Sequence, residues 1–469
     1  MKLSLAITFC LFAFVFPGAS ALSAAPLTVG AAKVDVTPTH PVILAGYGGR
    51  TKEHEGVDTK IWARALAIGE KDPAVIVAVD NCGIPAGVTR VVAKKLEKSH
   101  GIKPANLVLA VTHTHNAPSL RGYAVVVWGG RATDAQKANM NRYTDWLIER
   151  IVEAAGAALK ARRPASLSWG MGRAGFGGNR RVLNQGRWAG FGFQKDGPVD
   201  HSLPFMVAKD PDGKVIAVWA NYACHCTTLG GRNRICGDWA GFAGEGLEKD
   251  HPGSISVVTI GCGADVGPQP SRGIEDAKSH GEAIAAGVAE QMEKGLKKLA
   301  AIPSIGQRTI NLPLEKPAGR AHWEETAKRS DFHGYQAKLM LEKLKEKGKI
   351  QEVVPYTIST WRFNRDLALV FLPGEVVVDY AVRLKTELDY SRLWLNAWCN
   401  DMPGYIPSRR VLKEGGYEAD FSQVYYALPG RYKPDVEDLV IDTVRDLLGP
   451  DYLAPEGQAP ADFLRIKAR

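Results

Sequence analysis

The sequence predicts an α/β protein with large, mainly parallel or mixed sheets flanked by helices, and a site at the carboxyl ends of strands. Short apolar runs rich in β-branched residues alternate with segments of helical period, as at residues 74–80, 87–100 and 107–113. Polar side chains follow several of these runs directly, at the edge of an α/β sheet where sites are usually built. With 469 residues, the chain is long enough to bury a large core.

The same patterns assign an element to most of the chain, with no internal repeat and no linker that divides it. We expect a flexible loop at Gly46-Tyr47-Gly48-Gly49, where backbone can approach a ligand closely, and a long functional loop over residues 175–197. Strands are predicted over residues 31–37, 61–68, 74–80, 107–113, 165–173, 215–224, 256–260, 305–314, 356–363, 367–371 and 393–398. Helices are predicted over residues 87–100, 143–162, 241–249, 275–296, 337–347, 376–388 and 436–448, with 337–347 on the surface.

The composition is that of an ordinary globular protein, because 45% of the residues are hydrophobic and 23% are charged. The formal net charge is +9, but Lys and Arg are scattered along amphipathic segments and no nucleic-acid-binding motif accompanies them. We therefore expect no nucleic-acid partner and only a mild bias toward anionic substrates or surfaces.

The first 24 residues resemble a secretory signal peptide. Lys2 precedes an apolar run over residues 3–16, and small residues suitable for cleavage follow at Ala19-Ser20-Ala21 and at Leu22-Ser23-Ala24. An uncleaved membrane anchor is the alternative, and no later stretch is long and apolar enough to span a membrane. The expected product is a secreted or periplasmic protein in which residues 25–469 form one domain.

The cysteines fit an exported protein that is not a disulfide scaffold. Seven occur, and loss of Cys10 with the signal peptide leaves six. Cys226 with Cys236 is the most plausible disulfide, although one sequence does not define the connectivity.

Two histidines follow the apolar run that starts at residue 107, in Thr112-His113-Thr114-His115. A buried strand that delivers two imidazoles at its carboxyl end favours a metal site. The alternative interpretation is that both histidines are hydrogen-bonded members of a polar strand end, and the motif alone does not decide between the two.

Further candidate groups follow later strands. His225 comes at the end of the strand predicted over residues 215–224. Because side chains alternate faces along a strand, Cys224 and Cys226 point away from His225, which makes His225 alone the better ligand. Glu375 lies at a strand-to-helix junction, where a carboxylate more commonly serves to complement the helix dipole.

Two glycine-rich stretches have different implications. In the 175–197 loop, Asn179, Arg180 and Arg181 suit an anionic or carbonyl-bearing substrate, or they belong to a solvated charged loop. Residues 261–268 resemble a phosphate-binding loop in glycine spacing only, because no Lys-Ser/Thr follows and a proline stands where a helix should begin. Nucleotide binding is therefore not expected.

The order of several motifs along the chain is more informative than any one of them. They are Thr112-His113-Thr114-His115, His225 before Asp238, Pro373-Gly374-Glu375, Gly404-Tyr405-Ile406 with Tyr417-Glu418, and also Val34-Asp35-Val36-Thr37-Pro38, Gly46-Tyr47 and Asn179-Arg180. Together they resemble the catalytic domain of the neutral ceramidases, over nearly the whole mature chain. The resemblance implies a zinc-dependent hydrolase that cleaves a carbon–nitrogen amide bond.

The resemblance implies that one Zn²⁺ is bound by His113, His225, Glu375 and Tyr405. This mixture of nitrogen and oxygen ligands leaves Zn²⁺ a strong Lewis acid with room for water or a substrate carbonyl.

The resemblance also implies roles around the scissile amide. His115 is placed beside the reacting bond, where it can transfer protons. The backbone of Gly46 and the side chains of Arg180 and Tyr417 match positions whose hydrogen-bond donors can stabilise an oxyanion.

The chain departs from the family pattern at two motifs. Gly267 occupies the position of the family's active-site serine, and Asn116-Ala117 replaces Ser-Gly after the histidine motif. A metal-activated water can attack a carbonyl without that serine, and the glycine opens volume for a bulkier or more polar substrate than a lipid amide. The chain ends at Arg469, so no C-terminal β-sandwich is expected.

The leading hypothesis is thus a secreted, ceramidase-like zinc amidohydrolase acting on a small-molecule, lipid-amide or glycan substrate. One alternative is a zinc-dependent lyase that stabilises an enolate-like anion during elimination from an acidic sugar. The other is a metal-binding relative that has lost catalysis. The sequence predicts neither the substrate nor the oligomeric state.

Overall fold

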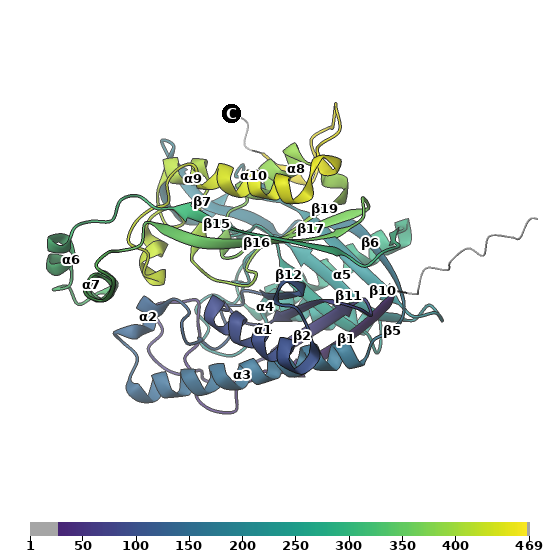
Figure 1. Ribbon diagram of the computed structural model, residues 1–469, viewed down its shortest axis with the longest axis horizontal. Helices are drawn as coiled ribbons and strands as arrows, with labels where there is room; N and C mark the ends of the chain where they lie inside the picture. The colour runs from purple at the N-terminus through teal and green to yellow at the C-terminus, as the bar shows by residue number, and fades with distance from the viewer. Residues whose placement is uncertain (1–26, 467–469) are drawn as a thin grey trace, which may run out of the picture.

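The computed structural model describes residues 27–466 and confirms the α/β class, with helices packed outside three mixed sheets (Figure 1). The predicted signal peptide lies outside the described residues. Within residues 27–466, no helix combines the length and apolar character that crossing a bilayer requires.

The first sheet has the strand order β4-β3-β2-β1-β5. Its pairs are antiparallel except β3 with β4, which are parallel and joined by the crossover helix α1 (Ala86–His100). Helix α1 and the long helix α3 (Asp134–Lys160) cover the outer face (Figure 1). The strands are β1 (Thr28–Asp35), β2 (Trp62–Ile68), β3 (Ala74–Val79), β4 (Leu107–Val111) and β5 (Arg163–Pro164).

The second sheet has the order β12-β11-β10-β6-β14, in which only β11 and β12 are parallel. Helices α4 (Asp238–Asp250) and α5 (Ile274–Lys294) pack together against it. The strands are β6 (Ser166–Arg173), β10 (Ser202–Lys209), β11 (Val215–Tyr222), β12 (Ile255–Ile260) and β14 (Lys297–Leu299).

The third sheet has the order β15-β16-β17-β19, with β17 and β19 parallel. Helix α10 (Val436–Leu448) packs on β15 and β16 and contacts α8 (Asp379–Glu387), and both lie on the outer side of the sheet (Figure 1). The strands are β15 (Ser304–Pro313), β16 (Val353–Phe363), β17 (Leu367–Phe371) and β19 (Leu393–Asn396).

The inner faces of the three sheets share one apolar core. Trp219 of β11 lies at its centre, fully buried, with its ring centroid 4.6 Å from that of Trp394 and 6.0 Å from that of Trp361. Side chains of β2, β3 and β4 complete the same cluster from the first sheet. The carboxyl ends of strands from all three sheets are therefore fixed relative to one another.

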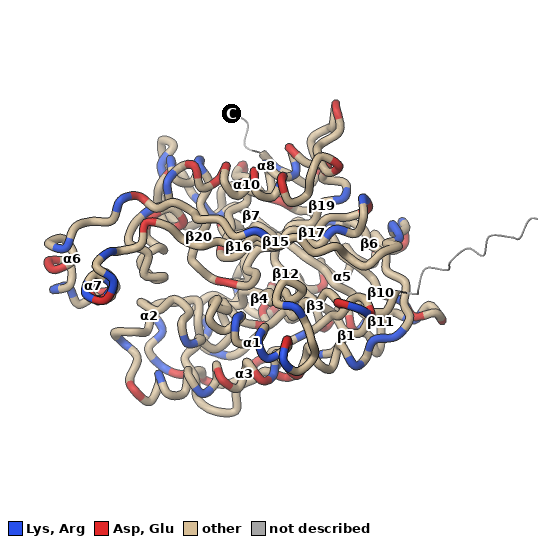
Figure 2. The backbone as a smooth tube through the Cα atoms, viewed as in Figure 1, with Lys and Arg blue, Asp and Glu red and all other residues tan. Residues whose placement is uncertain are grey.

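The remaining elements are short or peripheral. Helices α6 and α7 lie at one end of the molecule, and α7 is partly exposed, as expected (Figure 1). The short and peripheral elements are α2 (Val125–Gly129), α6 (Arg320–Thr326), α7 (Phe332–Lys347), α9 (Arg409–Glu414), β9 (Val199–Asp200), β13 (Val266–Pro268), β18 (Glu375–Val376), β20 (Tyr405–Ile406), β21 (Leu464–Arg465) and the 3₁₀ turns Pro104–Asn106, Tyr390–Arg392, Phe421–Tyr426 and Pro450–Tyr452. Basic and acidic residues are interspersed along the chain (Figure 2).

The expected long loop over residues 175–197 is wrong. The segment forms a β-hairpin of β7 (Gly177–Asn184) and β8 (Arg187–Gln194), and β7 also pairs with β13. Gln185 and Gly186 have φ values of 48° and 75°, as a two-residue hairpin turn requires. The many other glycines of residues 175–197 made this turn indistinguishable from a loop in the sequence.

Strand direction also differs from the "mainly parallel" expectation, since most pairs are antiparallel and the mixed alternative holds. Periodicity identifies a strand but not the direction of its neighbour. The parallel pairs include β3–β4 and β11–β12, whose carboxyl ends lead to His113 and His225.

The predicted Cys226–Cys236 disulfide is wrong, because all six cysteines of the described part are buried free thiols. The chain after β4 passes between the two residues. The backbone of Thr114 forms an isolated β-bridge with that of Cys226, and the Thr114 hydroxyl donates a hydrogen bond to the carbonyl of Cys236 at 2.8 Å.

We predict that Trp219→Ala lowers the free energy of unfolding by about 3–5 kcal/mol, because it leaves a cavity where the three sheets meet. Urea unfolding followed by circular dichroism measures the change. Val91→Ala, on the exposed side of α1, is the control and should change stability by no more than about 0.5 kcal/mol. Equal midpoints for the two variants would contradict a shared central core.

Candidate metal centre and active site

His113 lies two residues beyond β4 in a left-handed backbone conformation, with φ of 56°. Its Nδ1 donates to the carbonyl oxygen of Cys82 at 2.6 Å, which fixes the ring and leaves Nε2 facing the interior. A non-glycine residue at positive φ is a strained position that persists only where surrounding contacts impose it. The neighbouring backbone supplies such a contact, since the amide of His115 donates to the carbonyl of Cys226 at 3.2 Å.

His225 and Glu375 reach the same point from the other two sheets. His225 follows β11, and its Nδ1 donates to the carbonyl of Gly263 at 3.0 Å. Glu375 begins β18 shortly after β17, and its Oε1 accepts a 2.5 Å hydrogen bond from the hydroxyl of Tyr426. Each side chain is thus held on its outer side, with His225 Nε2 and Glu375 Oε2 facing inward.

The three inward atoms form a compact, buried cluster. Glu375 Oε2 lies 3.2 Å from His113 Nε2 and 3.3 Å from His225 Nε2. Among the described residues, His225 Nε2 and Glu375 Oε2 have no hydrogen-bond partner. Ligand atoms about 2.0–2.1 Å from a tetrahedral zinc ion lie roughly 3.3 Å apart, so the donor set and its spacing fit a metal ion. A second group that shares His113, formed with Cys82 and His115, also has metal-ligating spacing.

The electrostatics of the cluster favour a cation beside Glu375. Burial opposes ionisation of this carboxyl, but the adjacent His113 and His225 hold its pKa well below its usual range. Burial, with the charge of Arg180 acting in the same direction, lowers the pKa of His225 to about 3, so His225 is a neutral imidazole as metal binding requires. Burial lowers the pKa of His113, whereas the charges of Cys82 and Glu375 outweigh it and raise that pKa to about 10. A proton on His113 or a metal ion supplies the positive charge that the carboxylate needs.

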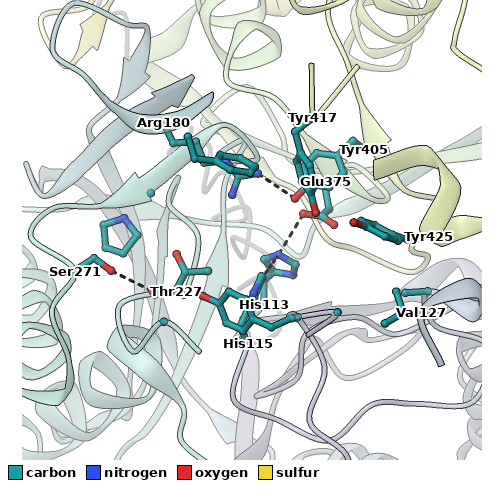
Figure 3. A pocket seen from close by; sticks show the side chains of 18 of the residues that line it. His113, His115, Val127, Arg180, Thr227, Ser271, Glu375, Tyr405, Tyr417 and Tyr425 are labelled. Atoms are coloured by element: carbon teal, nitrogen blue, oxygen red, sulfur yellow. Dashed lines mark hydrogen bonds and ion pairs between the residues drawn. The ribbon is translucent and has the colours of Figure 1, made fainter. Parts of the chain in front are cut away.

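Tyr405 lies next to Glu375, because the two residues are register partners in the parallel pair β18–β20. Its hydroxyl accepts a 3.1 Å hydrogen bond from Nη2 of Arg180, and its ring lines the same cavity as His113 (Figure 3). Burial, with the charge of Glu375 as a further cause, raises the pKa of Tyr405 well above its usual value. The structure thus places His113, Glu375 and Tyr405 at one cavity. The fourth sequence-predicted ligand, His225, lies behind this wall in direct contact with Glu375.

His115 lies beside the cluster, with Nε2 3.1 Å from His113 Nε2. Gly46 makes this position possible, because its φ is 92° and a Cβ there would lie 2.4 Å from Cγ of His115. Burial, with His113 and His225 acting in the same direction, holds the pKa of His115 well below its usual value. The side chain is therefore a neutral imidazole.

A cavity of about 460 Å³ opens onto these groups. Thr227 and Ser271 lie on one side of His113 and His115, whereas Val127 and Tyr425 lie on the other (Figure 3). Gly267 lines the cavity, and a Cβ on it would have no atom within 4 Å. A larger residue would therefore fit at position 267, and its side chain would take up free space in the cavity.

Arg180 is the member of the predicted Asn179-Arg180-Arg181 group that faces the cavity. Its guanidinium lies 5.8 Å from the ring centroid of Tyr417, which also lines the cavity. Arg181 binds Glu414 and Glu418 instead. Asn179 donates to Asp265 at 3.1 Å, so the alternative of a solvated loop is wrong for these two buried residues.

Sequence reasoning missed three residues that support the cluster from behind: Cys82, Tyr123 and Tyr426. Cys82 Sγ lies 3.2 Å from the hydroxyl of Tyr123, whose ring packs against that of Tyr426. These residues belong to connections without a periodic pattern, and only their position in the fold identifies them.

Comparison with known proteins gives a family match and two similar folds. The sequence model described as neutral/alkaline non-lysosomal ceramidase, N-terminal, matches residues 27–286. The fold is similar to that of the neutral ceramidase from Pseudomonas aeruginosa, with a TM-score of 0.69, 18% identity, and coverage of 93% of this chain and 77% of that chain. A ceramidase solved in complex with C2 gives a TM-score of 0.68 at the same identity and coverage. No curated protein sequence matches the chain significantly.

We predict that Tyr426→Phe weakens the affinity of this cluster for a divalent metal ion by about 10–100-fold, because it removes the hydrogen bond that orients Glu375. Competition with a chromophoric chelator measures the affinity. Tyr425→Phe is the matched control. This neighbouring tyrosine lines the cavity beside Tyr417, and its substitution should leave the metal affinity unchanged. Equal affinity in the two variants would show that Tyr426 does not orient the carboxylate.

Proposed function

The chain belongs to the neutral/alkaline non-lysosomal ceramidase family, and from this membership we propose that it is an exported, zinc-dependent hydrolase of a carbon–nitrogen amide bond. The observation that carries the proposal is the inward-facing set of His113 Nε2, His225 Nε2 and Glu375 Oε2 within 4.8 Å of one another. The family implies a metal-dependent hydrolase, and the donor spacing suits a tetrahedral ion.

We assign Zn²⁺ to His113, His225, Glu375 and Tyr405. When bound, the ion supplies Lewis acidity, which polarises a carbonyl group and lowers the pKa of water. Tyr405 is proposed as the fourth ligand because it is paired with Glu375 across β18 and β20 and lines the same cavity.

His115 is the proposed proton carrier. Its neutral imidazole lines the cavity beside His113, and its Nδ1 has no partner within the described residues. Hydrolysis adds the oxygen of water to the carbonyl carbon and a proton to the leaving amine nitrogen. His115 accepts the proton that water loses and delivers it to that nitrogen as the carbon–nitrogen bond breaks.

Arg180 and Tyr417 are the proposed oxyanion donors, with the backbone of Gly46 as a further contact to the substrate. The two side chains line the cavity above Glu375 (Figure 3). Donors fixed in advance stabilise the negative charge that develops on a carbonyl oxygen during attack. Burial, with Glu375 as a further cause, raises the pKa of Tyr417, which keeps this hydroxyl protonated as a donor.

Gly267 supports a substrate that is bulkier or more polar than a lipid amide near the metal centre. Gly267 lines the same cavity as Thr227 and Ser271. Val127 and Tyr425 offer apolar surface on the other side of His113 and His115. We therefore propose a small-molecule, lipid-amide or glycan substrate whose two ends differ in polarity.

A lyase that acts on an acidic sugar is the second candidate. The contact between Arg180 and Tyr405 favours it, because a cation and a phenol beside Glu375 suit an enolate-like anion. We also propose that residues 1–24 are removed on export and that residues 25–469 form the hydrolase domain; the N-terminal sequence of the secreted protein tests this.

We predict that the purified protein binds one Zn²⁺ per chain and that His113→Ala loses it, because His113 supplies one of three buried donors. Inductively coupled plasma mass spectrometry measures the stoichiometry, and His322→Ala, an exposed histidine on α6, is the control. Absence of stoichiometric metal from the parent protein would end the zinc proposal.

Mass spectrometry of reactions in ¹⁸O-labelled water, with and without chelator, then identifies the bond broken. A hydrolase incorporates one labelled oxygen into the acid product. A lyase incorporates none and forms a product with a new double bond. Failure to turn over any amide or acidic glycan with zinc bound would support the non-catalytic alternative.

We predict that Gly267→Ser and Gly267→Ala both reduce turnover of the bulkiest accepted substrates, because each fills space beside the metal centre. Turnover of small amides should stay within about threefold of the parent value. Comparison of kcat/KM across a size series measures the effect, and the alanine variant separates volume from the hydroxyl group. Unchanged selectivity in both variants would show that this space does not receive substrate.

A further inference from the structure

Two consecutive arginines of β7 bind a single buried carboxylate. Arg180 Nε donates to Oε1 of Glu418 at 3.0 Å, and Arg181 Nη1 donates to Oε2 of the same group. Glu418 is fully buried, and so is the side chain of Arg181. One arginine therefore occupies each oxygen of this carboxylate.

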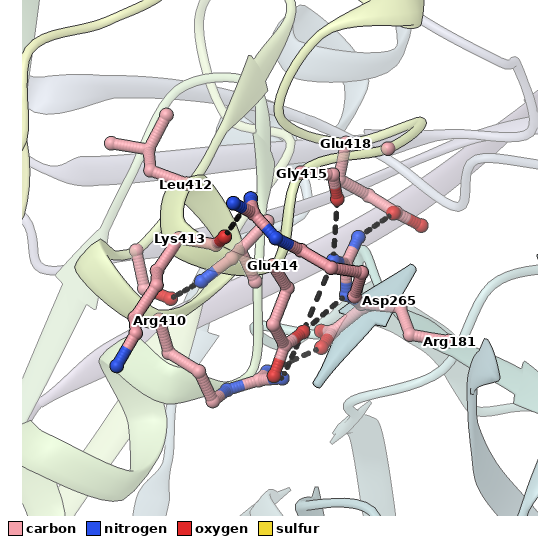
Figure 4. Close-up of polar contacts among 12 residues, drawn as sticks. Arg181, Asp265, Arg410, Leu412, Lys413, Glu414, Gly415 and Glu418 are labelled. Atoms are coloured by element: carbon pink, nitrogen blue, oxygen red, sulfur yellow. Dashed lines mark hydrogen bonds and ion pairs between the residues drawn. The ribbon is translucent and has the colours of Figure 1, made fainter. Parts of the chain in front are cut away.

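The two arginines serve different surroundings. The guanidinium of Arg180 turns toward the cavity, where Nη2 donates to the hydroxyl of Tyr405. The guanidinium of Arg181 turns the other way, to Glu414 at 3.1 Å and to the carbonyl of Gly415 at 2.8 Å (Figure 4). Glu418 is the group that connects the cavity with the ion-pair network behind it.

That network is extensive and anchored on several elements. Arg410 of α9 pairs with Glu414 at 2.9 Å, with Asp379 at 2.6 Å and with Asp265 at 3.2 Å (Figure 4). Asp265 in turn accepts a hydrogen bond from the backbone of Val378 at 2.8 Å. Breaking a buried ion pair leaves an uncompensated charge, so such a network holds its members in one geometry.

We propose that Glu418 is a positioning residue for the reaction, which fixes the guanidinium of Arg180 against Tyr405 at the wall of the cavity. The inference rests on the proposed function, in which Arg180 and Tyr417 contact the substrate oxygen. Tyr417 is the residue immediately before Glu418, so one anchored carboxylate constrains both donors. Glu418 itself does not line the cavity within the described residues, and it acts through Arg180.

Glu414 provides a matched control for the test. Its carboxylate belongs to the same buried network and binds Arg181 and Arg410, but it forms no hydrogen bond or ion pair with Arg180 within residues 27–466. Glu414→Gln and Glu418→Gln each remove one negative charge from the network at constant side-chain size. Only Glu418→Gln removes the carboxylate that holds Arg180.

The first measurement is steady-state kinetics on an amide that the parent protein hydrolyses. Glu418→Gln should lower kcat by about 10–100-fold with KM changed by less than about threefold, because misplacing a donor costs transition-state stabilisation. Glu414→Gln should keep kcat within about threefold, and both variants should retain one Zn²⁺ per chain. Equal losses of kcat in the two variants would reduce Glu418 to a structural role and overturn the proposal.

The second measurement does not depend on turnover. The ¹⁵N–¹H signal of Arg180 Nε, assigned from its absence in Arg180→Lys, reports the contact with Glu418 directly. The signal should shift and exchange faster with solvent in Glu418→Gln, and it should remain in place in Glu414→Gln. An unchanged signal in Glu418→Gln would overturn the proposal whatever the kinetics show.

These two measurements separate the positioning role from the proposed function. If the parent protein hydrolyses none of the amides, the proposed function fails, while the Arg180 signal still tests the positioning role. If Glu418→Gln does not fold, Glu418→Asp replaces it, since it keeps the charge and withdraws the carboxylate from Arg180. The same loss of kcat and the same change in the Arg180 signal are then expected, and parent-like values for both would overturn the proposal.

Discussion

The structure depends on one unsatisfied oxygen. Glu375 Oε2 is buried and faces two imidazole nitrogens at 3.2 and 3.3 Å, yet it accepts no hydrogen bond among the described residues. A buried carboxylate without a compensating partner is unfavourable by several kcal/mol, so a fold that retains this arrangement must provide positive charge at the same point. Outer hydrogen bonds from His113 to Cys82, from His225 to Gly263 and from Tyr426 to Glu375 keep the inner atoms aimed at one another.

The fold meets this requirement by bringing three sheets to one point. His113 follows β4 of the first sheet, His225 follows β11 of the second, and Glu375 follows β17 of the third. Because the inner faces of these sheets share the core around Trp219, their strand ends cannot move independently. The packing of large aromatic side chains and the spacing of the three donor atoms are therefore consequences of the same assembly.

Much of the fold could be predicted from the sequence where a pattern is local. The strand over residues 367–371 and the helix over residues 436–448 have the predicted bounds, since apolar runs and amphipathic periods define them. The helix predicted over residues 376–388 forms as α8 over Asp379–Glu387, but its predicted first residue, Val376, belongs instead to β18, which pairs with β20. Strand direction, the β7–β8 hairpin and the free state of Cys226 and Cys236 depend on contacts distant in sequence.

The candidate site divides in the same way. His113 and His225 were recognisable because each directly follows a predicted strand, and Tyr405 was found only through the resemblance to a family. Tyr426 had no signal in the sequence, and Glu418 appeared only within the motif Tyr417-Glu418, with no role assigned to it. Each acts through a partner more than 50 positions away, as the contact between Tyr426 and Glu375 illustrates with a separation of 51 residues. Sequence patterns thus identify groups at strand ends, whereas the residues that orient those groups emerge only from the folded arrangement.

The β7–β8 hairpin lines the cavity but belongs to none of the three large sheets. Strand β8 pairs only with β7 within the described residues, and its Phe191 is 55% exposed while lining the cavity together with Gly192. Mutations on this edge strand reshape the cavity wall without disturbing the sheets that carry His113, His225 and Glu375. Side-chain size at Phe191 therefore sets the width of the cavity mouth independently of the spacing of the three inward-facing donor atoms.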